Sequence, residues 1–255
     1  MPTEARPKLA IITGASRGLG RNTALNLARR GVDVILTYHS NRAEADAAVA
    51  EIEALGRKAK AFALDTGNVA AFDVFAADVA RALNEIWGRD RFDYLVNNAG
   101  IGVNAPFSAT KEADFDRLCD VHFKGVFFLT QKLLPLIADG GRIINLSSGV
   151  VRFAAPGYSA YAAMKDAIEV LTRYLAKELG PRRIAVNAVA PGATETDFAG
   201  GLIRKPEYNE RVASVTAMGR VGVPDDIGPA IASLLSDEYR WMTGQRIEVS
   251  GGQQL

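Results

Sequence analysis

The chain has 255 residues, of which 48% are hydrophobic and 23% charged, and 30 basic side chains nearly balance 29 acidic ones. This composition supports a large buried core and excludes a disordered chain. The net charge of +1 gives no overall field for nucleic acid or an anionic membrane. No signal peptide is predicted, no apolar run reaches the roughly 18 residues of a membrane span, and the single Cys119 forms no internal disulfide. We expect a soluble cytoplasmic protein without nucleic-acid or membrane partners and without a metal site.

Short apolar runs alternate with longer amphipathic segments along the whole chain. Several runs are nearly continuous in apolar residues, as in strands buried on both faces of a parallel sheet. The intervening segments carry apolar residues at helical spacings of three and four, as from Val69 to Ile86 and from Met164 to Leu179. The alternation predicts one α/β domain over residues 1–255, a doubly wound parallel sheet (Rossmann-like) that binds ligands at the carboxyl ends of its strands. The predicted strands are Leu9–Thr13, Val32–Thr37, Ala59–Leu64, Tyr94–Val96, Arg142–Leu146, Ala185–Ala190 and Arg246–Val249.

A glycine-rich turn follows the first predicted strand and precedes a helix expected near Arg21. It contains Gly14, Gly18 and Gly20. Glycine permits positive φ and lets the backbone approach a ligand closely, and the free N–H groups of the helix N-terminus can bind a pyrophosphate. The spacing differs from the common G-x-G-x-x-G fingerprint. The turn alone is therefore only a weak indication of a dinucleotide site.

A serine, a tyrosine and a lysine follow further along the chain, with Tyr161 thirteen residues beyond Ser148 and Lys165 four residues later. Positions i and i+4 share one face of a helix, so the Lys165 ammonium can lie near the Tyr161 phenol. A nearby cation lowers the pKa of a phenol from about 10, which suits proton exchange with a carbonyl oxygen. Such pairs are also common on helix surfaces. The glycine turn makes catalysis the leading hypothesis.

Together these motifs resemble the short-chain dehydrogenase/reductase family, in its shorter single-domain form. The glycine turn reads Thr-Gly-x-x-x-Gly-x-Gly, Asn97-Asn98-Ala99-Gly100 follows the fourth predicted strand, and Ser148, Tyr161 and Lys165 follow in order. The stretch from Pro191-Gly192 to Thr196 resembles the loop that meets the nicotinamide carboxamide. Because several ordered motifs agree over residues 8–252, the resemblance is specific.

The resemblance implies a role for each matching residue. Ser148, which fits the spacing better than Ser147, would bind the substrate oxygen, Tyr161 would transfer the proton, and Lys165 would tune Tyr161 and hold the nicotinamide ribose. Asp65 would meet the adenine, although it could instead cap a helix or turn. The cofactor-binding residues implied are Gly14, Ser16, Arg17, Gly18, Leu19, Gly20, Thr37, Asp65, Thr66, Asn98, Ala99, Gly100, Tyr161, Lys165, Pro191, Gly192, Thr194 and Thr196.

One position departs from the family pattern. His122 stands where many members have an asparagine that stabilises a helix kink and a water leading to the lysine. Neutral histidine also has one donor and one acceptor. Two alternatives therefore stay open: His122 serves as a fourth catalytic residue in a substitute proton relay, or it packs in the helix without a proton role.

The residues after the second predicted strand bear on the choice of cofactor. An NAD-preferring fold places an acid here for the ribose 2′-hydroxyl, but the sequence reads Thr37-Tyr38-His39-Ser40-Asn41-Arg42. Arg17 and Arg42 could bind a 2′-phosphate through their guanidinium groups. We expect NADP(H) to be favoured over NAD(H), with dual use as the alternative, and carbonyl reduction as the cellular direction.

The segment Phe123–Ile137 is apolar on more than one helical face, whereas a helix that covers one side of a sheet needs a single stripe. It is either deeply buried or packed on another subunit. The family commonly assembles through this segment and the one at Tyr158–Leu179, which implies a homo-oligomer, either a tetramer or at least a dimer.

The predicted function is hydride transfer between NADP(H) and a carbonyl/alcohol substrate, a small molecule that the sequence does not name. Val150, Val151, Phe153, Tyr158 and Phe198 are expected to face it.

Three alternative functions remain. A 3-oxoacyl-carrier-protein reductase would use Arg204, Lys205 and Arg211, in a mobile substrate-side segment at 194–217, to meet an acidic carrier. A non-catalytic nicotinamide-sensing protein could dispense with Ser148 and its partners, and an epimerase of the extended family needs a larger substrate region.

Overall fold

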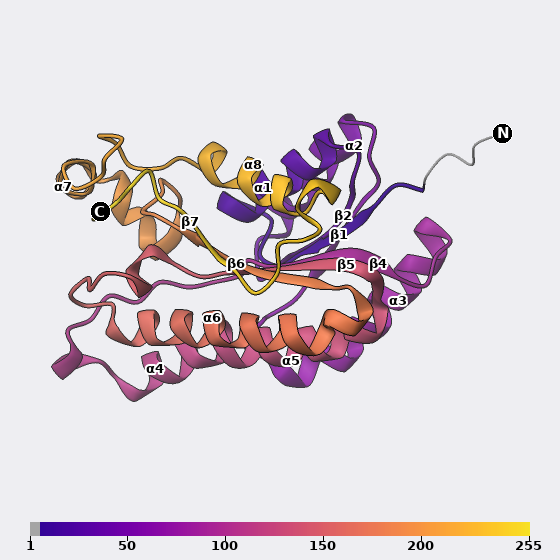
Figure 1. Ribbon diagram of the computed structural model, residues 1–255, viewed down its shortest axis with the longest axis horizontal. Helices are drawn as coiled ribbons and strands as arrows, with labels where there is room; N and C mark the ends of the chain where they lie inside the picture. The colour runs from indigo at the N-terminus through magenta and orange to yellow at the C-terminus, as the bar shows by residue number, and fades with distance from the viewer. Residues whose placement is uncertain (1–5) are drawn as a thin grey trace.

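The computed structural model describes residues 6–255. They form a sheet of seven parallel strands with helices on both faces (Figure 1). The sheet order is β3-β2-β1-β4-β5-β6-β7. The order reverses direction between β1 and β4, which is where a doubly wound sheet opens a crevice for a ligand. The predicted fold class is confirmed. The strands are β1 Leu9–Ile12, β2 Asp33–Tyr38, β3 Ala59–Ala63, β4 Phe92–Asn97, β5 Ile137–Leu146, β6 Ala185–Pro191 and β7 Arg246–Val249.

Alternate side chains of the strands build two separate hydrophobic cores. Ala10 and Ile12 of β1 belong to the core beneath α1 Gly18–Arg29, α2 Arg42–Ala54 and α8 Pro224–Leu234. Leu9 and Ile11 point the other way, into the core beneath α3 Phe72–Trp87, α5 Gly125–Leu133 and α6 Ser159–Leu179. Successive residues of a strand face opposite sides of the sheet, so a strand between two helical layers is apolar at every position. Figure 1 shows the two layers above and below the strands.

Two strands begin earlier than the apolar pattern predicts. β4 begins at Phe92 and includes Asp93, whose buried carboxylate accepts hydrogen bonds from the Leu9 amide at 2.9 Å and from Arg89 at 2.8 Å. A buried carboxylate is tolerated when it is paired in this way. β5 begins at Ile137 and passes through Gly140 and Gly141. Glycine has no side chain to contribute to an apolar strand pattern, so the pattern does not predict this part of the strand.

The helix predicted at Phe123–Ile137 is divided into three parts. Asp120–Lys124 forms a π-helical turn between α4, Glu112–Cys119, and α5. Leu134–Leu136 then makes a 3₁₀ turn before β5. Gly125 follows the π turn, and a Cβ there would overlap the carbonyl of Thr66. The wider turn thus brings this helix against the loop that follows β3.

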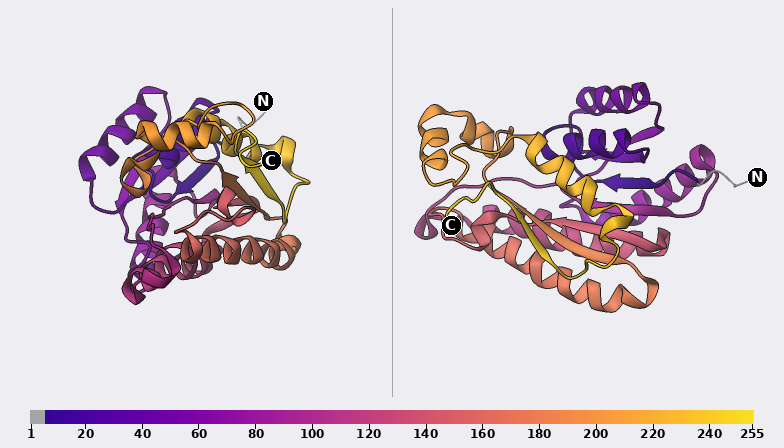
Figure 2. Two further views of the ribbon diagram at one scale, coloured as in Figure 1. Left: turned by 90° about the vertical axis from the view of Figure 1, so that its left-hand side faces the viewer. Right: turned by 45° about the horizontal axis from the view of Figure 1, so that its top comes forward.

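The remaining helix, α7 Pro206–Ala213, lies beyond the carboxyl edge of the sheet near the chain's C-terminus (Figure 2). No helix among residues 6–255 combines the length and hydropathy needed to cross a membrane.

Candidate active site

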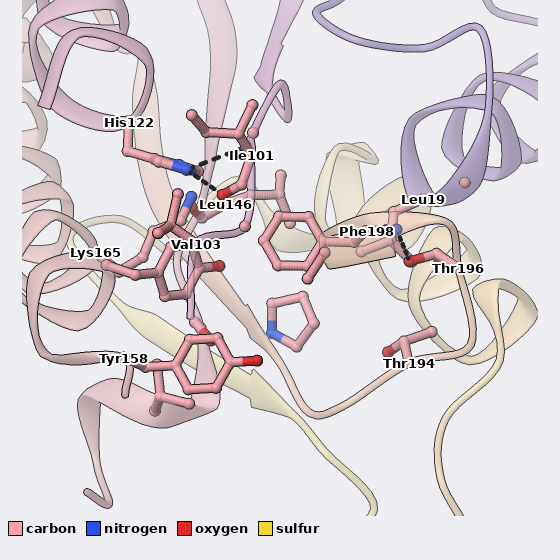
Figure 3. A pocket seen from close by; sticks show the side chains of 18 of the residues that line it. Leu19, Ile101, Val103, His122, Leu146, Tyr158, Lys165, Thr194, Thr196 and Phe198 are labelled. Carbon is pink, nitrogen blue, oxygen red and sulfur yellow. Dashed lines mark hydrogen bonds between the residues drawn. The ribbon is translucent and has the colours of Figure 1, made fainter. Parts of the chain in front are cut away.

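A cavity of about 1500 Å³ lies at the carboxyl ends of the strands, the end turned toward the viewer in the left panel of Figure 2. Loops that follow β1 to β6 contribute to its walls, and α7 closes one side with Tyr208, Arg211 and Val212. The volume exceeds the 300–1,000 Å³ typical of a single small ligand, so it suits a dinucleotide and a substrate together. In Figure 3, His122, Lys165 and Tyr158 lie on one side of the cavity and Thr194 and Thr196 on the other.

The glycine turn has the geometry of a phosphate cradle. Gly14 and Gly18 have φ values of 63° and 56°, which favour glycine. A Cβ on Gly14 would lie 2.9 Å from the Ala99 Cα, and one on Gly20 would lie 2.5 Å from Asn98 Nδ2. Helix α1 begins at Gly18 and has no side-chain cap. Gly18 and Leu19 of its first turn line the cavity, and the free N–H groups of a helix N-terminus can bind an anionic pyrophosphate.

The loop after β4 is bound to this turn by side-chain hydrogen bonds. Thr13 Oγ1 accepts hydrogen bonds from the amides of Asn98 and Ala99, both at 3.0 Å. Asn98 Nδ2 donates to the carbonyl oxygens of Thr13 at 2.8 Å and Gly14 at 3.1 Å. Thr37 Oγ1 accepts the Gly14 amide at 3.2 Å. These hydrogen bonds fix the distance between the turn after β1 and the loop after β4, and with it the width of the crevice.

Ser148, Tyr161 and Lys165 converge at the opposite wall. Ser148 follows β5 and lies beside the Tyr161 hydroxyl, where it acts to lower the pKa of the phenol. Lys165 Nζ lies 5.7 Å from the centre of the Tyr161 ring and donates to the Leu146 carbonyl at 2.6 Å. Ser147 Oγ donates instead to Glu169 at 2.5 Å and is buried. Ser147 is therefore engaged by Glu169, whereas Ser148 lies beside Tyr161 and lines the cavity together with it.

Burial sets the protonation of this group. Burial raises the pKa of Tyr161 to about 12, with the Ser148 hydrogen bond acting in the opposite direction. Burial lowers the pKa of Lys165 to about 7. The expectation that Lys165 lowers the pKa of Tyr161 is wrong for this geometry, because Lys165 is turned to the Leu146 carbonyl and desolvation dominates both groups. Tyr161 is protonated at neutral pH, the form that can donate a proton.

His122 occupies the centre of the π turn and is 1% exposed. Its Nε2 lies 2.7 Å from the Ile101 carbonyl oxygen (Figure 3), and its ring meets the Tyr161 ring edge-on at 5.1 Å. The same Nε2 lies 3.1 Å from the Ile101 amide nitrogen, which donates to it, so the Ile101 backbone holds this nitrogen on both sides and the ring hydrogen can be on Nε2 or on Nδ1. Burial, and to a lesser extent Lys165, holds the pKa of His122 well below its usual value. The imidazole is neutral, and its buried Nδ1 has no hydrogen-bond partner among residues 6–255.

Most of the predicted site residues line the cavity. Gly20 and Thr37 do not, since both lie behind the turn and support Gly14 and Asn98. Arg17 lines the cavity, whereas Arg42 bonds Asp46 on α2 at 3.4 Å. Val151 also lies off the cavity wall. The predicted residues on the wall are Gly14, Ser16, Arg17, Gly18, Leu19, Asp65, Thr66, Asn98, Ala99, Gly100, His122, Val150, Ser148, Phe153, Tyr158, Tyr161, Lys165, Pro191, Gly192, Thr194, Thr196 and Phe198.

Several wall residues carried no sequence signal. Asn104 lies in the long loop after β4, and Gln253 and Gln254 lie in the last five residues of the chain. Neither place belongs to a motif or a periodic segment. His39, which stands after β2, marks the end of the cavity near Asp65; its place directly after a predicted strand was the available signal.

Comparison with known proteins agrees with this site. A sequence model described as "Enoyl-(Acyl carrier protein) reductase" matches residues 14–254, and a 3-oxoacyl-[acyl-carrier-protein] reductase, FabG, of Staphylococcus aureus is 39% identical over 96% of this chain and 97% of its own. The chain belongs to the short-chain dehydrogenase/reductase family. This confirms the family resemblance and the prediction of an oxidoreductase.

Two solved structures of family members are also similar. The reductase LugOII, which catalyses a keto-reduction in lugdunomycin biosynthesis, superposes with a TM-score of 0.93 at 39% identity, covering 98% of this chain and 100% of LugOII. The angucycline C-6 ketoreductase LanV with bound NADP superposes with a TM-score of 0.92 at 37% identity, covering 97% of this chain and 95% of LanV.

The lowered pKa of the buried Lys165 leads to a prediction of how folding stability depends on pH. Burial lowers its pKa from 10.5 to about 7 in the folded chain. Between these values the unfolded chain binds more protons, so folding stability is lost as the pH falls from about 10.5 toward 7. Lys165→Met lacks this titrating group. As the pH falls through this window, the free energy of unfolding of the variant should therefore rise relative to that of wild type, by at most about 1.4 kcal/mol per pH unit.

Urea unfolding of both proteins across the window measures this difference. Lys177→Met, on the same helix at an exposed position, is the control and should track wild type. Parallel pH profiles for wild type and Lys165→Met would contradict a neutral buried lysine.

Proposed function

We propose that this protein reduces a bulky aromatic or polycyclic ketone to an alcohol, with NADPH as the hydride donor. The observation that carries the substrate class is the aromatic wall around the proton donor. The Tyr161 ring lies 5.8 Å from Phe198 and 6.2 Å from Tyr158, and Phe153 and Tyr208 also line the cavity. Such rings favour a flat apolar substrate through offset and edge-on contacts. The ketoreductases LugOII and LanV support the same class.

The chain is an NADP-linked oxidoreductase that works on a carbonyl/alcohol pair in the reducing direction. Bound NADPH supplies the hydride. The turn at Gly14–Gly20 and the N-terminus of α1 would hold its pyrophosphate, and the loop from Pro191 to Thr196 would hold its nicotinamide end.

The catalytic side chains act on the substrate oxygen. The Ser148 hydroxyl donates a hydrogen bond to the carbonyl and the Tyr161 phenol transfers its proton to the same oxygen as negative charge develops there. Lys165, four residues from Tyr161 on α6, is held by the Leu146 carbonyl and would bind the nicotinamide ribose of the cofactor. All three groups are in place before substrate binds, so little reorganisation accompanies the reaction.

A second candidate function is reduction of 3-oxoacyl groups on a carrier protein, which the 39% identity with FabG favours. Arg204 is paired with Asp197, and Arg211 stacks on Tyr208 at 4.9 Å and lines the cavity. Two of the three basic residues expected to meet a carrier are therefore engaged within the substrate-side wall. This arrangement favours the free aromatic ketone over the carrier-bound substrate. A non-catalytic sensor is disfavoured because the catalytic groups are assembled.

The function is tested by a panel of aromatic and aliphatic ketones, with an acyl-carrier thioester included, followed by NADPH absorbance. Tyr161→Phe should lower kcat on the best substrate by about 10²–10⁴-fold, because it removes a positioned acid, while NADPH still binds. Tyr174→Phe, on an exposed part of α6, is the control. Retention of more than about a tenth of wild-type kcat would exclude Tyr161 as the acid, and a thioester preferred over every ketone would establish the second candidate.

His122 is proposed to serve the proton relay rather than only to pack. Its Nδ1 has no hydrogen-bond partner within the described residues and belongs to a buried ring next to Tyr161 and Lys165. A water between Nδ1 and Lys165 would give that nitrogen a partner and connect the lysine to the relay.

We expect His122→Asn to keep kcat within a few-fold of wild type and His122→Ala to lower it at least about tenfold. Asparagine can bond the Ile101 backbone and hold a water, whereas alanine can do neither. Steady-state kinetics with folding checked by circular dichroism measures this. Equal kcat for the three residues would show that the relay bypasses position 122.

Arg17 is the proposed contact for the 2′-phosphate of NADPH. It lines the cavity beside the first turn of α1, whereas Arg42 is directed to Asp46. A charge-assisted hydrogen bond contributes enough for Arg17→Ala to raise the Kd of NADPH at least about tenfold, with NADH little affected. Fluorescence titration with both cofactors measures the Kd values, and Arg42→Ala is the matched control. A wild-type preference for NADH would refute the assignment.

A homotetramer is proposed on the exposed apolar face of α4, α5 and α6. Phe115, Phe127, Val170 and Tyr174 there are 43%, 39%, 40% and 65% exposed, and apolar area of this kind marks interfaces. Sedimentation velocity should give a tetramer for wild type and smaller species for Phe127→Glu, and a wild-type monomer at micromolar concentration would contradict it.

A cytoplasmic location is also proposed, because a chain with a single cysteine forms no internal disulfide and suits a reducing compartment. Cell fractionation tests this location.

The substrate-side segment 194–217 is proposed to be mobile. Ala199, Gly200 and Gly201 have φ values of 51°, 71° and 73° and could serve as its hinge, which amide exchange would test.

A further inference from the structure

Arg152 follows the short turn Gly149–Val151 that begins directly after Ser148, and its guanidinium is held by four oxygens. Nε and Nη2 donate to the two carboxylate oxygens of Glu248 at 2.9 and 2.8 Å. Nη1 and Nη2 also donate to the backbone carbonyls of Gln254 at 2.9 Å and Gln253 at 2.5 Å. One side chain thus joins the catalytic serine's turn, strand β7 and the C-terminal residues.

The last residues of the chain form a tail, Gly251–Leu255, that is hydrogen-bonded to residues 215–218, the segment following α7. The Ala217 and Met218 amides donate to the carbonyls of Gly252 at 3.1 Å and Gly251 at 3.0 Å, and the Gln254 amide donates to Val215 at 2.8 Å. Thr216 and Gln253 pair as in an antiparallel sheet. The tail therefore anchors the far end of the substrate-side wall.

The same tail also reaches the nicotinamide-side loop. Gln253 is 8% exposed, and its Oε1 accepts the Ala193 amide at 2.9 Å. A Cβ on Gly192 would lie 3.0 Å from this oxygen, so the loop and the Gln253 side chain are in close contact. Gln253 also lines the cavity.

The carboxylate that holds Arg152 is itself held on its other side. Glu248 accepts hydrogen bonds from Arg246 Nη1 at 2.8 Å and from Ser250 Oγ at 2.7 Å. Arg246 Nε donates in turn to Glu169 on α6 at 2.7 Å, one turn beyond Lys165. The Arg152 guanidinium on this carboxylate, with Ser250 and Arg246, lowers the pKa of Glu248 to about 2. Arg152 is thus fixed relative to the catalytic helix.

We infer that Arg152 and Gln253 are positioning residues that lock the C-terminal tail across the active site. Arg152 holds the tail against the Ser148 turn, and the tail in turn holds the end of α7 and the loop at Ala193. The distances between the proton donor, the nicotinamide end of the cofactor and the substrate wall depend on this lock.

The tail needs such an anchor because its backbone is permissive. Gly251, Gly252 and Gln254 have φ values of 64°, 76° and 57°, and two adjacent glycines lose much conformational freedom when they are ordered. The planar guanidinium fork can bind a carboxylate and two carbonyls together, which a lysine ammonium cannot do in the same geometry.

The test uses full-length Arg152→Lys and Gln253→Ala with a ketone that wild type reduces. We expect Arg152→Lys to lower kcat/KM about tenfold to hundredfold, mainly through the KM of the ketone, because small displacements near a reacting centre have effects of this size. The Kd of NADPH, titrated without ketone, should change less than about threefold. Gln253→Ala should act mainly on kcat, since it frees the loop at Ala193.

Hydrogen exchange of the NADPH-bound protein gives a second measurement that needs no substrate. Arg152→Lys should speed amide exchange in residues 214–218 and 192–194, and Gln253→Ala in 192–194. If wild type reduces no ketone, the proposed substrate fails while exchange still tests the lock.

Arg182→Lys is the matched control. Arg182 also binds two carbonyls and a carboxylate, those of Leu134, Ile137 and Asp139, but it lies at the opposite end of the sheet from the cavity. It should lose stability without changing KM or exchange at 214–218. Unchanged kinetics and exchange in both lock variants, or changes in Arg152→Lys no different from those in Arg182→Lys, would overturn the inference. Should Arg152→Lys fail to fold, the kinetics of Gln253→Ala and its amide exchange at 192–194 decide whether the inference stands.

Discussion

The close contact between the turn after β1 and the loop after β4 is the constraint on which the site depends. Thr13 Oγ1 accepts both the Asn98 and Ala99 amides, and Asn98 returns hydrogen bonds to the carbonyls of the turn. Gly14 and Gly20 leave room for this contact because a Cβ at either would collide with the neighbouring loop. The contact therefore fixes the width of the crevice that the change in strand order opens between β1 and β4.

Burial gives the catalytic group its chemistry. Desolvation disfavours charge on any group, so it raises the pKa of the phenol of Tyr161 and lowers the pKa of the ammonium of Lys165. An acid that stays protonated at neutral pH, next to a cation that is easily discharged, is suited to giving a proton to a carbonyl oxygen. The same burial keeps His122 neutral, and a neutral imidazole can pass a proton without storing charge in the core. One physical effect, desolvation, thus sets the protonation states of all three groups.

The ionic side chains near the C-terminus have a different task. Glu169, Arg246, Glu248 and Arg152 form a continuous chain of hydrogen-bonded pairs from α6 to the tail. Exposed ion pairs contribute little to stability one at a time, but a network with bidentate arginines fixes geometry. Here it joins segments that are distant in sequence and meet only around the cavity. Through the tail, the network holds the residues on either side of the segment that contains two consecutive glycines and a left-handed alanine.

The sequence by itself determined the fold class, the glycine turn and the order of Ser148, Tyr161 and Lys165, because apolar periodicity and helical spacing are local properties of the chain. It also placed His122 at an unusual position. Tertiary structure decided what those residues do to one another. Burial, which no spacing reports, reversed the expected pKa shift of Tyr161. Gln253 and Arg152 joined the site through contacts across about 100 residues of chain, and packing, not pattern, brought them together.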